Sequence, residues 1–294
     1  MRAAAIQLNS TPDRASNLRV AESLVRRAAA AGAELVVLPE KWPLLGTPAQ
    51  TAAGAEPLDG PTLEWSTSLA RELGVDLVAG SFSERVESSP RGHNTCFHVG
   101  PDGAIRARYR KLHMFDSEVA GTVYRESDVE APGDEVVLSA TDSGVGLGLA
   151  ICYDLRFPEL FRLLALAGAR IVALPSAFTE TTTLAHWDVL VRARAIENSC
   201  FVVAANQFGS HAPGSRSGGR SMIVDPWGTV LAQAPDGEGL AIADLDLARQ
   251  DEIRVKLPSL ANRRPAAYGW PQSAPGRLEA TVTAAGSSSS PAAR

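Results

Sequence analysis

Cys152 is the residue of this chain best placed to act as a nucleophile. It follows an aliphatic, glycine-interrupted run, VGLGLAI at 145–151, and precedes a segment that turns helical at Pro158. A strand that breaks sharply into a helix presents its last side chain at the carboxyl edge of a sheet, where the next backbone N–H groups can bind a developing oxyanion. The alternative is a buried structural cysteine, the commoner fate of a free thiol.

Two charged residues occupy comparable places in the sequence. Glu40 follows a buried-strand pattern at 34–38, and Lys111 follows a hairpin pattern, so both are expected at a sheet edge. A carboxylate near a thiol can act as its base, and an ammonium group can stabilise a thiolate or a tetrahedral oxyanion. The alternative for each is a solvated loop charge, as most Glu and Lys side chains are.

Alternating helix and strand patterns must position these residues. Apolar side chains recur at helical spacing over 18–28, with Ser16 as the expected N-cap and Gly32 as the expected stop. The run AGAELVVLPE at 31–40 is echoed by AGARIVALPS at 167–176. This echo indicates an α/β fold in which two halves share one plan.

A hairpin is predicted just before Lys111. Strand patterns at 94–99 and 104–109 flank the residues Gly-Pro-Asp-Gly at 100–103, which have the chemistry of a turn. The hairpin therefore places Lys111 just past a strand end.

Composition excludes several classes of protein. Hydrophobic residues make up 45% and charged residues 21% of the 294, as in ordinary globular proteins. A net charge of −5 and a pI near 5.6 argue against a nucleic-acid partner. The start of the chain lacks a signal-peptide pattern and no run is apolar enough to span a membrane, so we expect a cytoplasmic protein with no membrane partner.

The cysteines and histidines support no disulfide framework and no metal site. Cys96, Cys152 and Cys200 are odd in number and far apart, so at least one thiol is free. The five histidines form no ligand-spaced pair with them. From residue 272 the chain is rich in Ala, Ser, Gly and Pro, which predicts a domain at 1–271 and a mobile tail at 272–294.

Three ordered motifs make the chain resemble the nitrilase superfamily of carbon–nitrogen hydrolases. They are LPE at 38–40, YRKLH at 109–113 and ICYDLRFPE at 151–159, and the likeness continues through ARAIEN at 193–198, ANQ at 205–207 and SMIVDPWG at 221–228. The resemblance implies a four-layer αββα sandwich, usually assembled into homodimers or larger homo-oligomers. It also implies hydrolysis of non-peptide carbon–nitrogen bonds without a metal or organic cofactor.

Carried over by this resemblance, the catalytic roles fall on matching positions. Glu40 is the general base and Cys152 attacks the carbonyl carbon. Lys111 and the backbone N–H of Tyr153 stabilise the oxyanion. Ammonia leaves, and water then cleaves the thioester.

A finer resemblance concerns the segment after Lys111. KLHMFD at 111–116 and YRES at 124–127 are similar to the Nit branch of the superfamily, which includes ω-amidase and deaminated-glutathione amidase. This likeness makes Glu126 the second glutamate that positions substrate, although the spacing from Gly121 is one residue short of the expected pattern. Glu118 is the competing candidate.

Substrates of that branch carry a carboxylate, and Arg156 is a natural partner for it through paired N–H donors. An ion pair of Arg156 with Glu159 or Asp154 is the alternative interpretation. Phe178 and Thr179, with His186 and Trp187 further along, follow the second Leu-Pro strand end and could line the pocket or belong to the core. A papain-like pairing of His113 with Cys152 is disfavoured, because Lys111 already completes the motif.

The resemblance therefore predicts an amidase that cleaves a small, carboxylate-bearing linear amide through a cysteine thioester and releases ammonia. The first alternative is hydrolysis of nitriles or N-carbamoyl compounds by the same superfamily chemistry, since the residues lining a pocket decide the substrate. The second is a binding or assembly protein that keeps the fold without catalysis, which the intact set of Glu40, Lys111 and Cys152 disfavours.

Overall fold

The computed structural model describes residues 1–267, and its compact unit is Met1–Ala261. Residues 262–267 contain a short 3-10 turn, Pro265–Ala267. The expected domain end at 271 and the expected tail at 272–294 lie outside the described residues.

Two mixed β-sheets form the centre of the compact unit. The first has the order β17-β1-β2-β3-β5-β4 with β6 also paired to β5, and the second has the order β16-β15-β12-β11-β10-β9. The strands of the first are β1 Arg2–Gln7, β2 Leu35–Val37, β3 Asp76–Val78, β4 Phe82–Glu84, β5 His93–Val99, β6 Ile105–Arg110 and β17 Gly239–Asp244. Those of the second are β9 Leu138–Ala140, β10 Gly146–Leu149, β11 Ile171–Ser176, β12 Phe201–Asn206, β15 Met222–Val224 and β16 Val230–Gln233.

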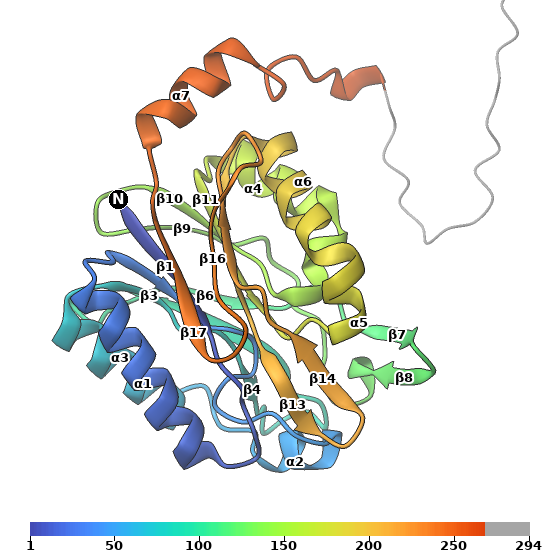
Figure 1. The fold of residues 1–294 in the computed structure, drawn as a ribbon. Coiled ribbons are helices and arrows are strands. Elements are labelled where there is room, and N and C mark those ends of the chain that lie inside the picture. Colours follow the sequence, from blue (N-terminus) through green and yellow to red (C-terminus); the bar gives the residue numbers. More distant parts are fainter. Residues whose placement is uncertain (268–294) are drawn as a thin grey trace, which may run out of the picture. The chain divides into compact units, whose positions relative to one another are not determined.

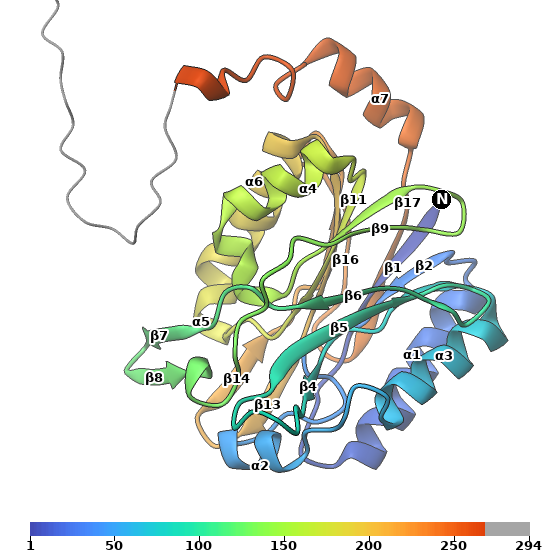
Figure 2. The same cartoon turned by 180° about the vertical axis from the view of Figure 1, so that it is seen from behind.

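Helices cover the outer face of each sheet, and the two sheets pack against each other (Figure 1). α1 (Arg14–Ala30) and α3 (Pro61–Leu73) pack on the first sheet through residues such as Leu24 and Leu69. α4 (Pro158–Ala167) and α6 (Asp188–Asn198) pack on the second. Seen from behind, the same order of helices, sheet, sheet, helices holds (Figure 2). The expected four-layer αββα sandwich is confirmed.

The internal repeat has a structural counterpart. In the first sheet, β1, β2 and β3 are parallel neighbours connected through α1 and α3. In the second sheet, β10, β11 and β12 are parallel neighbours connected through α4 and α6. Each half is therefore a βαβαβ unit, and the echoed sequences at 31–40 and 167–176 contain the middle strand of each.

The first helix begins earlier than its sequence pattern suggests. Asp13 is the N-cap of α1, and its carboxylate accepts the backbone N–H of Ser16 at 3.0 Å, so the expectation that Ser16 caps the helix is wrong. A carboxylate accepts such a bond as well as a hydroxyl does, and proximity to the helix N-terminus favours the negative charge. Gly32 follows the helix with φ +83°, as expected of a stop residue.

The predicted hairpin before Lys111 is present as β5 and β6, with Gly103 at φ +77° in the turn. Two smaller hairpins are β7 (Asp116–Val119) with β8 (Thr122–Arg125), and β13 (Phe208–Ala212) with β14 (Ser215–Gly218). The remaining elements are α2 Pro48–Ala53, α5 Glu180–Thr182, α7 Leu247–Lys256, a π-helical turn Thr183–Trp187, and 3-10 turns at Glu126–Asp128 and Cys152–Arg156.

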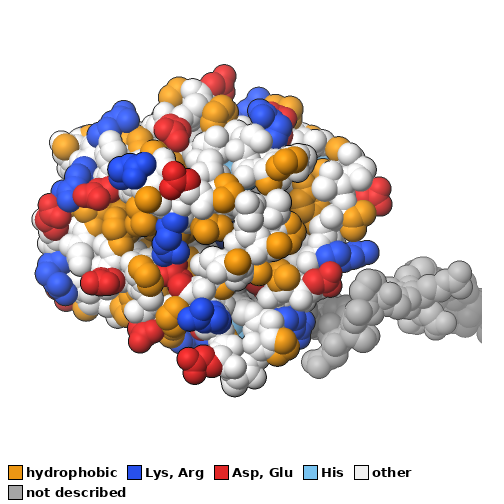
Figure 3. Space-filling view, turned by 90° about the horizontal axis from the view of Figure 1, so that it is seen from below, with side chains coloured by type: hydrophobic (Ala, Val, Ile, Leu, Met, Phe, Trp, Pro, Cys, Tyr) orange, Lys and Arg blue, Asp and Glu red, His pale blue; other side chains and the backbone are white. Residues whose placement is uncertain are grey.

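One face of the molecule carries charges of both signs. On the face seen in Figure 3, basic and acidic side chains are interspersed among hydrophobic and uncharged ones, and the described basic residues form no continuous patch there. No helix within residues 1–267 is both long and apolar enough to cross a bilayer.

The close approach of β10 to the turn before β11 offers a test of the packing. A Cβ atom at Gly146 would clash with the carbonyl oxygen of Gly168, a backbone atom that cannot move easily. We expect Gly146→Ala to lower the free energy of unfolding by about 1–3 kcal/mol, as overpacking does, measured by chemical denaturation. Gly239→Ala is the control, because a Cβ atom there would lie 3.4 Å from the ring of Pro235, an ordinary van der Waals distance. Equal stability of the two variants would contradict this packing.

Candidate active site

Cys152 lies at a strained turn between the second sheet and α4. β10 ends at Leu149, and Cys152 opens the 3-10 turn with φ +46°, a left-handed conformation that is unfavourable for a residue with a Cβ atom. Pro158 then starts α4, as its fixed φ favours. The expected break from strand to helix is present, with Cys152 three residues beyond the strand end.

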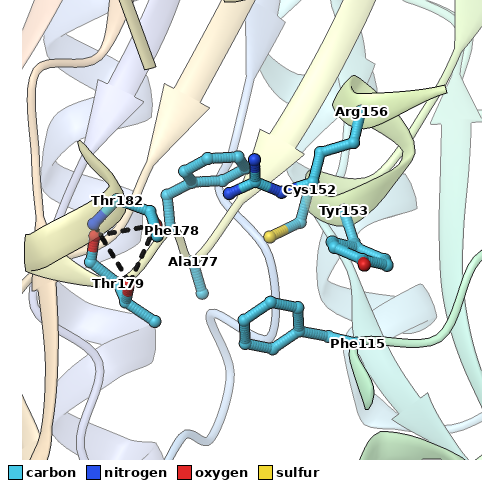
Figure 4. A pocket seen from close by; sticks show the side chains of 8 residues that line it. All are labelled: Phe115, Cys152, Tyr153, Arg156, Ala177, Phe178, Thr179 and Thr182. Atoms are coloured by element: carbon cyan, nitrogen blue, oxygen red, sulfur yellow. Dashed lines mark hydrogen bonds between the residues drawn. The ribbon is translucent and has the colours of Figure 1, made fainter. Parts of the chain in front are cut away.

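A pocket surrounds the thiol. Figure 4 shows the sulfur of Cys152 pointing toward a space bordered by Phe115, Tyr153 and Ala177. The lining residues are Phe115, Cys152, Tyr153, Arg156, Ala177, Phe178, Thr179 and Thr182. The pocket thus brings together five residues singled out from the sequence, namely Cys152, Tyr153, Arg156, Phe178 and Thr179.

Glu40 and Lys111 form a buried ion pair beside this pocket. Lys111 Nζ lies 2.9 Å from Glu40 Oε1, and both side chains are at most 5% exposed. The other carboxylate oxygen of Glu40 accepts the backbone N–H of Ala177 at 2.9 Å, and the carboxylate also faces the thiol of Cys152. Neither charge is therefore a solvated loop charge.

The two candidates for the second glutamate lie in different surroundings. Glu126 contacts Lys111 Nζ through both carboxylate oxygens, at 2.8 and 2.9 Å, and accepts the backbone N–H of Phe115 at 2.6 Å. Glu118 lies exposed on β7. Only Glu126 therefore joins Glu40 and Lys111.

Burial and charge together set the protonation of the thiol and the ammonium group. Burial raises the pKa of Cys152 well above its usual value, and the Glu40 carboxylate adds to this, while Lys111 opposes it. Burial alone would lower the pKa of Lys111, but Glu126 and Glu40 outweigh that effect and raise it. The resting site therefore has a neutral thiol beside a cationic lysine.

Arg156 lies at the pocket without the ion pairs considered from the sequence. Its guanidinium stacks near the rings of Tyr153 and Phe178, 5.8 and 5.3 Å from the ring centroids, and contacts His186 Nδ1 at 3.3 Å. Within the described part of the chain it forms no ion pair with Asp154 or Glu159. The structural ion-pair interpretation is wrong, and the guanidinium remains available to a ligand in the pocket.

Asp154 has other partners, which explains why it does not bind Arg156. Its carboxylate accepts the hydroxyl of Tyr109 at 2.6 Å and the backbone N–H of Ile151 at 2.8 Å, and contacts His113 Nδ1 at 2.7 Å. The ring of His113 stacks on Phe157 at 3.5 Å. His113 therefore supports the turn rather than pairing with Cys152, as expected.

Trp187 belongs to the core rather than to the pocket wall. It is fully buried, and its indole N–H donates to the carbonyl of Arg220 at 2.8 Å.

Sequence reasoning missed three polar residues at the site. Asn94 Nδ2 donates to Glu40 Oε1 at 2.8 Å, and Lys41 Nζ lies 2.8 Å from Glu130 and 3.5 Å from Glu126. Asn94 could have been found, because β5 runs antiparallel to β3 and so begins at the edge where β3 ends. Lys41 carries no such signal, because its side chain reaches the site only through a left-handed backbone turn at φ +50°, and its partner Glu130 lies 89 residues further along the chain.

No group of three or more His, Cys, Asp or Glu side chains within residues 1–267 is arranged to hold a metal ion. The polar groups at the site instead satisfy one another. The exception is the side-chain oxygen of Asn94, which is buried without a hydrogen-bond partner in the described structure.

Known proteins resemble this chain in sequence and in fold. The chain is 45% identical over 271 residues to the deaminated glutathione amidase of Homo sapiens, covering 90% of this chain and 83% of the relative. It is 37% identical to an omega-amidase of Pongo abelii, covering 91% and 96%. The crystal structure of the Caenorhabditis elegans NitFhit protein matches with a TM-score of 0.86 and 38% identity, covering 91% of this chain and 66% of that chain. The carbon-nitrogen hydrolase family model matches residues 2–255, and the chain belongs to that family.

Proposed function

We propose that this protein is an amidase that hydrolyses a small, carboxylate-bearing linear amide and releases ammonia. The observation that carries the proposal is the buried Glu40–Lys111 pair facing the thiol of Cys152 at the pocket. A proton acceptor, a cation and a nucleophile in one enclosed site are the groups that acyl transfer requires. Family membership supports the same reaction class.

In the first half of the reaction, Glu40 takes the proton of Cys152 as the sulfur attacks the amide carbon. The raised pKa of the thiol makes this base necessary, because little thiolate forms without it. Lys111 and the backbone N–H of Tyr153 stabilise the tetrahedral oxyanion. The carbon–nitrogen bond then breaks, Glu40 returns its proton to the nitrogen, and ammonia leaves a thioester behind.

In the second half, water attacks the thioester carbon while Glu40 accepts its proton. The carbon–sulfur bond breaks, the proton returns from Glu40 to the sulfur of Cys152, and the carboxylic acid product leaves. The sum is one amide and one water converted into one carboxylic acid and one ammonia. Side chains, backbone and water supply every step of this route.

A carboxylate on the substrate is inferred from Arg156. Its guanidinium lies at the pocket with aromatic rings beside it, and it contacts His186 there rather than an acidic side chain. Paired N–H donors in a partly dry pocket suit a carboxylate. Phe178 and Thr179 complete this part of the wall. The relatives named for deaminated glutathione and ω-amide hydrolysis support a substrate of this class.

The alternative reactions use the same residues. A nitrile or an N-carbamoyl compound would also be attacked by Cys152, so the site alone does not discriminate between them, whereas the named relatives favour amides. A binding protein without catalysis is disfavoured because Lys111, Glu40 and Glu126 remain buried in contact with one another.

We further propose that the protein is a homodimer that works in the cytoplasm. Large apolar side chains remain exposed on the outer faces of α4 and α6, where Leu163 is 52% and Val189 65% exposed. A second copy burying this face would remove them from water. The described cysteines are all free, and a free nucleophilic thiol suits a reducing compartment.

Ammonia release tests the reaction class. The panel contains α-ketoglutaramate, deaminated glutathione, simple aliphatic amides, N-carbamoyl amino acids and nitriles. We expect wild type to release ammonia from the first two, and Cys152→Ala to release none, because no nucleophile remains. Cys200→Ala is the control, since that thiol is buried away from the pocket. Carbon dioxide released with ammonia would favour the carbamoyl reaction, and ammonia from Cys152→Ala would contradict the mechanism.

Arg156→Gln tests the carboxylate pocket. Loss of a charged donor pair weakens binding, so we expect KM for a carboxylate-bearing amide to rise about tenfold or more. Turnover of an uncharged aliphatic amide, compared with wild type, should change little. Arg249→Gln on α7 is the matched control, because that side chain is exposed. An equal loss on both kinds of amide would show that Arg156 does not select the carboxylate.

Val189→Asp tests the dimer. A carboxylate on the proposed interface should halve the molar mass measured by light scattering after gel filtration, because burying an unpaired charge is costly. Val255→Asp on α7 is the control, since Val255 is 79% exposed and lies on another helix. An unchanged mass for Val189→Asp would place the interface elsewhere or leave the protein monomeric.

A further inference from the structure

A second buried ion pair lies next to the candidate active site. Lys41 Nζ is 2.8 Å from Glu130 Oε2 and 3.5 Å from Glu126 Oε1. The side chains of Lys41 and Glu130 are 13% and 4% exposed. Ser83 Oγ donates to the other oxygen of Glu130 at 2.9 Å, which fixes that carboxylate. Glu126 therefore lies between two lysines, Lys111 and Lys41.

A strained backbone conformation directs the side chain of Lys41 toward Glu126 and Glu130. Lys41 follows Glu40 directly and has φ +50°, in the left-handed region that residues with a Cβ atom rarely adopt. Its backbone N–H donates to Ser81 Oγ at 3.0 Å, which holds the turn. Backbone strain of this kind persists where the surrounding structure requires it. At this turn it allows two consecutive side chains, Glu40 and Lys41, to reach the same cluster.

Five charged side chains form one connected cluster that carries a net negative charge. The cluster is Glu40, Lys41, Lys111, Glu126 and Glu130, and its contacts run from Glu40 through Lys111, Glu126 and Lys41 to Glu130. Burial raises the pKa of Glu130, and Lys41 opposes that rise. With all five ionised, three carboxylates and two ammonium groups give a net charge of −1. The thiol of Cys152 adjoins this cluster at Glu40 and Lys111.

We propose that Lys41 and Glu130 are positioning residues that hold Glu126 against Lys111 and set the net charge that the Cys152 thiol experiences. This inference rests on the proposed function, in which Cys152 is the nucleophile. Neither residue reaches the pocket lining, so both would act through Glu126 and Lys111 rather than on the substrate.

The charged and titratable groups around Glu126 are few. Lys111 follows β6 and Lys41 follows β2, and both contact Glu126. Two carboxylates repel that of Glu126, namely Asp116 on β7 and Glu130, which shares Lys41 with it. Burial would raise the pKa of Glu126, but Lys111 and Lys41 outweigh it and hold that pKa well below its usual range. Removing Lys41 therefore removes one of the two cations that keep Glu126 ionised.

The two members of the pair have opposite effects on the thiol. Lys41→Met removes a positive charge, so while the three carboxylates stay ionised the cluster becomes more negative, which disfavours the thiolate and raises the thiol pKa further. Glu130→Gln makes it less negative and lowers the thiol pKa. The double variant restores the original net charge. If the pair only stabilised the fold, both single substitutions would shift the thiol pKa in the same direction or leave it unchanged.

The experiment measures the rate of Cys152 alkylation by iodoacetamide between pH 7 and 10, with the rate of the Cys152→Ala variant subtracted. At a fixed pH below the thiol pKa, we expect Lys41→Met to react more slowly and Glu130→Gln faster than wild type, each by about threefold. The double variant should react at nearly the wild-type rate. Lys41→Arg, which retains the positive charge, should also react at the wild-type rate. The exposed pair Lys256→Met and Glu252→Gln on α7 is the matched control.

Opposite shifts that cancel in the double variant would support the inference. Shifts in the same direction, or none, in variants that retain the wild-type circular dichroism would overturn it, and if Lys41→Met does not fold, Glu130→Gln alone decides. The assay reads the thiol directly. Failure of this inference is therefore distinct from failure of the proposed function, which ammonia release by Cys152→Ala would reveal.

Discussion

The need to neutralise buried charge governs this site. The side chains of Glu40 and Lys111 are at most 5% exposed and that of Glu126 is 10% exposed, so an isolated charge at any of these positions would carry a large desolvation penalty. Lys111 offsets this penalty by contacting both carboxylates at 2.8–2.9 Å. The contacts that make burial tolerable also place a proton acceptor and a cation beside the thiol, so stability and chemistry depend on the same atoms.

The fold supplies this geometry by bringing the ends of strands from both sheets to one place. Glu40 follows β2 of the first sheet, and Ala177 follows β11 of the second. They are joined directly, because the backbone N–H of Glu40 donates to the carbonyl of Ser176 at 3.3 Å and that of Ala177 donates to the Glu40 carboxylate at 2.9 Å. The site is thus assembled across the interface between the sheets and exists only when the two βαβαβ units are packed together.

The sequence could predict what depends on strand ends and local pattern. Glu40, Lys111 and Cys152 each follow a recognisable strand or hairpin, so their convergence could be inferred from the sequence alone. The cap of α1 could not be chosen securely, because Asp13 and Ser16 are both good caps and only the backbone decides between them. Lys41 and Glu130 were missed for a different reason, since their pairing depends on a left-handed turn and on a contact between distant segments.

The raised pKa of Cys152 has a consequence for the enzyme at rest. Oxidants and alkylating agents react with the thiolate, so a thiol held neutral by burial and by Glu40 is protected from them. A site built around a permanent thiolate would lack this protection. In the mechanism we propose, the nucleophile is instead formed during the reaction, when Glu40 accepts the proton and the negative charge moves on to an oxyanion beside Lys111. The surplus negative charge of the cluster therefore disfavours premature ionisation, while Lys111 favours charge on the oxygen of the bound amide, and the balance between them is where Lys41 and Glu130 act.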